Sequence, residues 1–131
     1  MFSYRHLFHI GNFADVLKHS TLIACIKHMS IKEKPFIVVD THAGAGKYSI
    51  TDPIGRDKME WELGLGKILK IKDQKRNLPP MMQDYLDLVI QFNNGDKFRF
   101  IPGSPALTLM LLRKKDKLWA FELHPSDFKN L

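Results

Sequence analysis

The stretch Phe36-Ile-Val-Val-Asp-Thr-His-Ala-Gly-Ala-Gly46 decides the fold of this chain. Its first four residues are apolar and partly β-branched, which is typical of a strand buried on both faces. Asp40 stands at the carboxyl end of that strand. Gly44 and Gly46 follow in a turn that should open a helix near Lys47. Strand, glycine turn and helix together predict the start of a nucleotide-binding α/β unit, in which glycine lets the backbone approach a ligand and adopt positive φ.

Two well-known phosphate-binding loops do not fit this turn. A G-x-x-x-x-G-K-[ST] loop fails because Thr41 replaces its first glycine and Tyr48 replaces its magnesium-binding hydroxyl residue. A G-x-G-x-x-G dinucleotide loop fails because Ser49 replaces the third glycine. The remaining pattern, an acidic residue followed by G-x-G, resembles the first motif of S-adenosylmethionine (SAM) methyltransferases. A strand-to-helix turn without a ligand is the alternative.

Composition indicates one globular domain. The chain has 131 residues, of which 44% are hydrophobic, and its charges are mixed. It has no apolar run long enough for a transmembrane helix, and Arg5, His6 and His9 interrupt any signal-peptide core. Cys25 is the single cysteine, so no internal disulfide forms, and its apolar neighbours predict a core position. We therefore expect a cytoplasmic protein without membrane association.

Basic residues exceed acidic ones by 20 to 14, which gives a net charge of +6. This excess favours a polyanionic partner, nucleic acid first, although solvated charges on an ordinary surface give the same balance. Lysines from Lys67 onward, with Arg76, make the helical region around them the expected nucleic-acid face. A solvated charged surface explains these lysines equally well.

The first 11 residues are rich in aromatic and histidine side chains. Tyr4, His6 and His9 offer rings that could stack on unpaired bases. An arm docked on the domain by its apolar residues is the alternative. A zinc site built from His6, His9 and His19 lacks the cysteines or carboxylates that would complete it.

The remaining elements follow from local signals. Asn12 should cap a helix that runs to about Met29 and packs on two sides. Lys18, on that helix, resembles an ordinary surface lysine by its position alone. Further helices are expected over 48–50, over 58–72 with interruptions at Gly64 and Gly66, and over 77–92 from an Asn77 cap. Two more are expected over 106–112, behind a Ser104 cap, and from 124 onward. Strands are expected over 98–101 and 118–123. The helix over 106–112 is almost wholly apolar, so we expect it to be buried.

Glu122 stands near the end of the last expected strand. In dinucleotide-binding folds an acidic residue about 20 positions beyond the glycine turn holds the ribose hydroxyls, and a carboxylate suits two such donors. Here 76 positions separate Gly46 from Glu122. We therefore interpret residues 1–55 as substrate arm, first helix and cofactor strand-turn, 56–97 as a helical insertion, and 98–131 as a continuation of the first part.

Several motifs together resemble the bacterial family that methylates an adenine N6 in 23S ribosomal RNA. They are Ser3-Tyr-Arg-His6 with His9, Gly11-Asn12, Ala14-Asp-Val-Leu-Lys-His19, Asp40-Thr-His-Ala-Gly-Ala-Gly46, Pro102-Gly-Ser-Pro105 and Glu122-Leu-His-Pro-Ser-Asp127. The likeness runs from end to end of the chain. It implies a Rossmann-like SAM-dependent methyltransferase fold with a small helical insertion, 23S rRNA as substrate, and a monomer at full length.

The resemblance also implies roles for particular residues. SAM-contacting positions of the family fall on His19, His42, Ser104 and Glu122, with Lys18, Asp40, Gly44 and Gly46 beside them. Tyr4 falls on a position that contacts the RNA, and His6 belongs to the same arm. For Lys18 the resemblance therefore favours a cofactor role over the surface role.

One family motif is missing from the chain. Enzymes of this kind use an Asp/Asn-Pro-Pro-aromatic loop to bind the amine and stack on the extruded base. The nearest match, Asp52-Pro53-Ile54, is broken by Ile54, which stands where the second proline belongs. The chain therefore resembles the amino-terminal half of a family member without its catalytic aspartate. Two alternatives follow: a non-catalytic nucleic-acid-binding protein, possibly linked to use of external DNA, or an inactive fragment that self-associates through an unfinished sheet.

Overall fold

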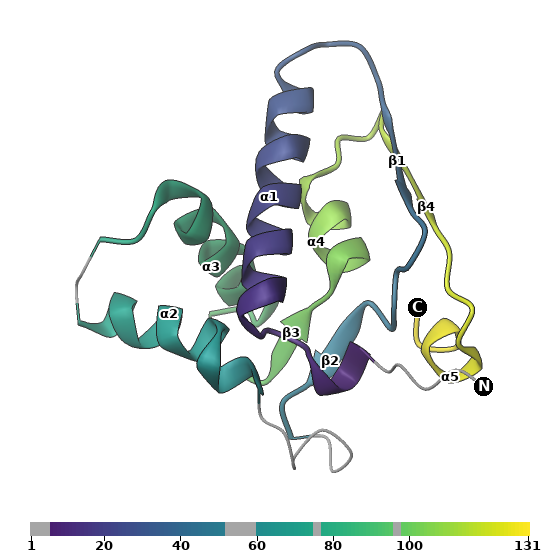
Figure 1. Cartoon of the computed structure of the whole chain (residues 1–131). Coiled ribbons are helices and arrows are strands. Elements are labelled where there is room, and N and C mark those ends of the chain that lie inside the picture. The colour runs from purple at the N-terminus through teal and green to yellow at the C-terminus, as the bar shows by residue number, and fades with distance from the viewer. Residues whose placement is uncertain (1–5, 52–59, 75–76, 96–97) are drawn as a thin grey trace.

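A computed structural model describes residues 6–51, 60–74, 77–95 and 98–131 (Figure 1). The chain is a mixed α/β protein with two small sheets. Its elements are η1 (His6–Phe8), α1 (Phe13–Ser30), β1 (Ile37–Asp40), β2 (Lys47–Ser49), η2 (Glu60–Leu63), α2 (Leu65–Asp73), α3 (Pro80–Phe92), β3 (Phe100–Pro102), α4 (Ser104–Leu111), β4 (Lys117–Ala120) and α5 (Pro125–Phe128). No helix in the described ranges is both long and apolar enough to cross a membrane.

Helix α1 forms the centre of the fold. It packs against α3 on one side and α4 on the other, which confirms the prediction of a helix with two buried sides (Figure 1). Asn12 caps it as predicted, because its side-chain oxygen accepts a hydrogen bond from the Asp15 N–H at 3.0 Å. Ile23 is fully buried, whereas Cys25 is exposed. The predicted core position of Cys25 is therefore wrong, because it lies on the strip of α1 that neither helix covers.

The two sheets pair segments that lie far apart in the sequence. β1 and β4 are parallel, with Val39 opposite Trp119, and β2 and β3 are antiparallel, with Tyr48 opposite Ile101. The glycine turn thus leads into a strand, and the helices predicted near Lys47 and over 48–50 are wrong. Pairing with β3 outweighs the local helix signal, since it buries the Tyr48 side chain to 4% exposure.

Among the described residues, helix packing covers only one face of the sheet of β1 and β4. Helix α4 packs against both strands. On the opposite face Ile37, Val39 and Trp119 each keep about half of their surface exposed, at 50%, 53% and 54%. The prediction of a strand buried on both faces is therefore wrong for this chain. The exposed apolar flank is the feature on which the self-association hypothesis rests, and self-association itself stays a prediction.

The other predicted helices shift at their ends. α3 begins at Pro80 with Pro79 as its N-cap, not at Asn77. α4 begins at Ser104 with Gly103 as its N-cap, and Leu109 on this helix is 63% exposed, so α4 is not wholly buried. The strand expected over 98–101 is β3, and the strand expected over 118–123 ends earlier, at Ala120.

Gly64 marks the place where α2 meets the start of α1. The Leu65 N–H donates to the Gly11 carbonyl at 2.8 Å, and a Cβ on Gly64 would lie 2.2 Å from the same oxygen. Glycine is therefore required by a backbone crossing, which ends η2 and starts α2. Helices α2 and α3 lie between the paired strands β2 and β3 in the sequence. The division into arm, insertion and continuation remains an interpretation.

Asn93 joins the end of α3 to β3. Its amide donates to the carbonyls of Val89 and Phe100 at 2.8 and 2.9 Å. Its side-chain oxygen accepts hydrogen bonds from the N–H groups of Arg99 and Phe100 at 3.0 and 2.9 Å. With Asn93 only 9% exposed, these bonds satisfy backbone groups that water reaches poorly.

Replacing Asn93 by alanine should lower the free energy of unfolding by about 1–3 kcal/mol, because buried backbone donors and acceptors lose their partners. Urea unfolding followed by circular dichroism measures the change. The matched control is Asn77→Ala at an exposed position, which should change stability by less than about 0.5 kcal/mol. Equal effects of the two substitutions would contradict this role of Asn93.

Candidate functional site

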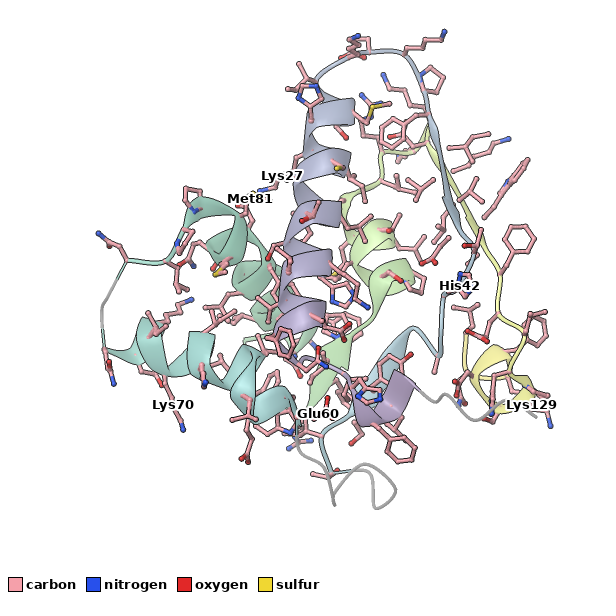
Figure 2. All side chains as sticks on the ribbon, viewed as in Figure 1. Lys27, His42, Glu60, Lys70, Met81 and Lys129 are labelled. Atoms are coloured by element: carbon pink, nitrogen blue, oxygen red, sulfur yellow. The ribbon has the colours of Figure 1, made fainter. Side chains whose placement is uncertain are left out.

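The candidate site lies where the parallel strands β1 and β4 end. Asp40, the last residue of β1, is opposite Ala120, the last residue of β4. Two backbone hydrogen bonds extend the pairing beyond the strands: the Phe121 N–H donates to the Asp40 carbonyl at 2.8 Å, and the Ala43 N–H donates to the Phe121 carbonyl at 3.0 Å. Carboxyl ends of parallel strands are the usual ligand-binding edge of such sheets. His42, labelled in Figure 2, lies at this edge.

Glu122 binds directly to the glycine turn. Its Oε2 accepts a hydrogen bond from the Gly44 N–H at 2.8 Å, and its Oε1 accepts one from the His124 N–H at 2.7 Å. Burial raises the pKa of this carboxyl, but the N–H donors of His124 and Gly44 outweigh burial and hold the pKa below its ordinary value. The distant acidic residue and the turn are therefore neighbours, as the sequence argument requires.

Asp40 is held in place by Ser104 at the start of α4. The Ser104 hydroxyl donates to Asp40 Oδ2 at 2.6 Å, and the His42 N–H donates to Asp40 Oδ1 at 3.2 Å. The Thr41 hydroxyl lies 2.9 Å from Nδ1 of the exposed His42 ring. Helix α4 and the turn after β1 thus orient one carboxylate between them.

Glycine is needed at position 44 for a structural reason that the sequence did not reveal. Its φ is +61°, and a Cβ there would lie 2.1 Å from the Tyr48 hydroxyl oxygen. That hydroxyl accepts a hydrogen bond from the Ala45 N–H at 3.0 Å, and burial raises the pKa of Tyr48. Glycine at this position therefore makes room for Tyr48. Gly46 also has a positive φ, +71°, and its carbonyl accepts from the Gly103 N–H at 2.7 Å.

A cleft of about 240 Å³ opens beside Asp40. Its lining comes from α1, β1, the following turn and α4, namely Leu22, Val38, Val39, Asp40, Thr41, His42, Ser104 and Thr108. Sequence reasoning missed Leu22, Val38 and Thr108. The Thr108 hydroxyl is buried and has no hydrogen-bond partner among the described residues. Its position four residues after Ser104 on α4 was the available signal, since residues i and i+4 share a helix face.

Two predicted cofactor residues, Lys18 and His19, are not among the residues that line this cleft. Lys18 is exposed, and its Nζ pairs with Asp15 Oδ1 at 2.9 Å. His19 is buried, with its ring centroid 5.6 Å from that of Tyr85 on α3. Tyr4 and the His6 side chain lie outside the described residues, as does Asp52-Pro53-Ile54. The structure therefore brings together Asp40, His42, Gly44, Gly46, Ser104 and Glu122 at one edge.

Metal chemistry finds no support in the described residues, and the expected basic helical face lies only partly within them, because Lys75 and Arg76 are outside the described ranges. Within these ranges no group of three or more His, Cys, Asp or Glu side chains could hold a metal ion. The described parts of the insertion, 60–74 and 77–95, contain three lysines and five acidic residues. Lys72 there lies 3.6 Å from Asp87. The site is instead a set of two hydrogen-bonded carboxylates, of which Asp40 lines a cleft with both polar and apolar walls, and it is suited to bind hydroxyl and ammonium donors.

Comparisons with known proteins agree on one family. The family described as ribosomal RNA large subunit methyltransferase D, RlmJ, matches residues 33–131. The ribosomal RNA large subunit methyltransferase J of Escherichia coli K12 is 42% identical over 128 residues, which are 98% of this chain and 44% of the relative. Its counterpart from Haemophilus influenzae is 38% identical over 129 residues, with the same coverage of 98% and 44%.

A solved structure is also similar to this chain. The crystal structure of protein LPL1258 from Legionella pneumophila superposes with a TM-score of 0.81 at 33% identity, over 92% of this chain and 43% of that protein. The chain thus spans less than half the length of the proteins that it matches.

Glu122 should make the stability of the chain depend on pH on the acid side. The pKa of Glu122 is lower in the folded chain than in the unfolded one. Its carboxylate therefore stabilises the fold at pH values above its unfolded pKa of about 4.3, and this stabilisation is lost as pH falls through the folded pKa. Glu122→Gln should therefore flatten the loss of stability below about pH 5. Urea midpoints at several pH values measure this. The exposed Glu62→Gln variant should keep the wild-type profile; identical profiles for both variants would refute the argument.

Proposed function

The chain belongs to the ribosomal RNA large subunit methyltransferase J family, and on that premise we propose that it binds SAM for methyl transfer to N6 of an adenine in 23S rRNA. The observation that carries the proposal is the hydrogen bond between the Glu122 carboxylate and the Gly44 N–H. This bond joins the acidic residue expected to hold a ribose to the turn expected to hold the rest of the cofactor. The activity is that of the whole enzyme, of which this chain covers the portion described above.

The proposed fold is a Rossmann-like domain. Support comes from the parallel pairing of β1 with β4, whose connection includes helices, and from the ligand-binding position of their carboxyl ends. The exposed apolar face of this sheet is consistent with a second covering layer in the family-length protein, since parallel sheets are normally covered on both faces.

The residues at the edge fit the polar parts of SAM. Bound SAM supplies a methyl group on a positively charged sulfur, which a nucleophilic nitrogen can accept. Glu122 offers carboxylate lone pairs to ribose hydroxyls, and Asp40 offers a second negative charge to the ammonium or sulfonium part. His42 and Ser104 supply further polar groups at the cleft. The proposed set also contains Lys18, His19, Gly44 and Gly46, as the family resemblance implies.

The proposed role of this chain in the reaction is to bind and orient. Transfer of the methyl group is an in-line displacement, in which positioning contributes most of the catalysis. The sequence contains no Asp/Asn-Pro-Pro-aromatic loop, so we assign no residue of this chain to the adenine amine. Tyr4 and His6 are proposed to contact the RNA, and the positive net charge of +6 favours that substrate.

Isothermal titration calorimetry tests the cofactor assignment with the intact chain. We expect SAM and its demethylated product, S-adenosylhomocysteine, to bind. Affinity should fall about tenfold or more in Glu122→Gln, because a hydrogen bond to a charged acceptor contributes about 1.5 kcal/mol or more. Glu62→Gln, exposed and remote from the turn in sequence, serves as the matched control and should bind as the wild type does.

A second ligand separates ribose binding from a mere change in the turn. An S-adenosylhomocysteine analogue without the two ribose hydroxyls should bind wild type more weakly than the parent compound. The Glu122→Gln variant should bind this analogue and the parent compound about equally well, since the variant lacks the carboxylate that would bind the hydroxyls. An undiminished preference for the hydroxyls in Glu122→Gln would reject Glu122 as the ribose ligand, and absence of any binding by wild type would reject the cofactor proposal.

A further inference from the structure

Two loops meet at the end of the molecule opposite the candidate site. One loop, residues 31–36, joins α1 to β1, and the other, residues 112–116, joins α4 to β4. Because β1 and β4 are parallel, both loops lie where the strands begin, whereas Asp40 and Glu122 lie where they end (Figure 1). We call residues 31–36 together with 112–117 the basic tip. A strand of four residues separates it from the site by about 13 Å.

Arg113 fixes the geometry of the basic tip. Its guanidinium donates to the carbonyls of Ser30, Lys32 and Lys34 at 3.0, 2.8 and 3.2 Å, so one side chain holds the whole first loop. It also donates to both carboxylate oxygens of Asp116, at 2.7 and 3.0 Å. That guanidinium holds the pKa of Asp116 well below its usual range. Asp116 in turn accepts from the Phe36 N–H at 3.2 Å, which ties the two loops together.

The basic tip has a large excess of positive charge. It contains six basic and two acidic side chains, and thus four of the six net positive charges of the chain. Arg113 neutralises Asp116, and Lys115 pairs with Glu33. Lys32, Lys34, Lys114 and Lys117 are exposed and form no ion pair within the described part of the chain. Four unpaired ammonium groups are therefore displayed on a framework whose backbone is fixed.

This chemistry fits phosphates better than it fits bases. Lysine binds phosphate as a point charge, and several phosphate contacts dominate the affinity of nucleic-acid binding proteins. Binding of unpaired bases needs accessible aromatic rings. Phe36, the single aromatic residue of the tip, has the Arg113 guanidinium 5.4 Å from its ring centroid and is partly buried. The tip therefore offers charge for a backbone and little surface for stacking.

We propose that the basic tip is a second RNA-contacting surface, which binds the phosphate backbone of a structured region of the RNA substrate away from the modified adenine. The inference deepens the proposed function and depends on it for the identity of the RNA. It places backbone binding on the loops at the start of β1 and β4, and not on the lysines of α2. Over the described residues 60–74, which contain α2, the three lysines are balanced by three acidic residues, Glu60, Glu62 and Asp73.

The test compares two triple variants of the intact chain that lose the same charge. The tip variant is Lys32→Gln/Lys34→Gln/Lys114→Gln, and the control is Lys67→Gln/Lys70→Gln/Lys72→Gln on α2. Fluorescence anisotropy with a short duplex RNA of mixed sequence gives the dissociation constant at several salt concentrations. The tip variant should bind about tenfold or more weakly at low salt, and its slope of log K against log salt should shrink by about 2–3. The control should change affinity by less than about threefold.

Three outcomes would overturn the proposal. They are an unchanged salt slope in the tip variant, a larger loss in the α2 variant than in the tip variant, and tighter binding of polyglutamate than of the duplex RNA, which would indicate an acidic protein partner. Calorimetry with SAM on the same variants distinguishes this result from failure of the proposed function. Cofactor binding should be unaffected by the tip substitutions. If the chain binds the duplex RNA through the tip but never binds SAM, the RNA-contacting surface stands and the methyltransferase assignment fails.

Discussion

The parallel pairing of β1 with β4 is the constraint on which the rest of the structure depends. Two carboxylates, Asp116 before β4 and Glu122 after it, accept hydrogen bonds from the N–H groups of Phe36 and Gly44 on either side of β1. The pair of strands is thereby held by a side-chain hydrogen bond at each end, although β1 and β4 are about 80 residues apart in sequence. Hydrogen bonds to ionised acceptors are stronger than neutral ones. These two bonds therefore stabilise the register that places Glu122 beside the glycine turn.

Local signals were sufficient for most of the helices. The Asn12 cap, the prolines before α3 and the Ser104-Pro105 pair placed the starts of α1, α3 and α4 to within a few residues. Long-range pairing could not be predicted in the same way. Nothing near Tyr48 indicates that it will pair with Ile101 across the intervening helices, so β2 was mistaken for a helix. Exposure of one sheet face was also missed, because apolar strand residues alone do not show whether a covering layer is present.

The residues of the site also differ in whether local signals could predict them. Asp40 and Glu122 were predicted as site residues from their places at the ends of strands, and Ser104 from the family resemblance. The structure brings all three to one edge. Thr108 was missed because a single hydroxyl in an apolar helix gives a weak signal. The requirement for Gly44 was predicted for a different reason, since contact with Tyr48 arises only after β2 has paired. Lys18 and His19 owe their proposed role to family resemblance, and in this structure they contact Asp15 and Tyr85.

The distribution of charge explains why backbone binding and cofactor binding belong at opposite ends of the sheet. Two carboxylates at the carboxyl ends of β1 and β4 suit hydroxyl and ammonium groups, but the same charges repel phosphates. Electrostatic attraction for an RNA backbone has to come from another part of the surface, and the loops before the strands carry four net positive charges. At physiological ionic strength the Debye length of about 8 Å is shorter than the strand length of about 13 Å that separates the two groups. Salt therefore screens them from each other, so the lysines do not neutralise the acidic edge and each end of the sheet keeps its own ligand preference.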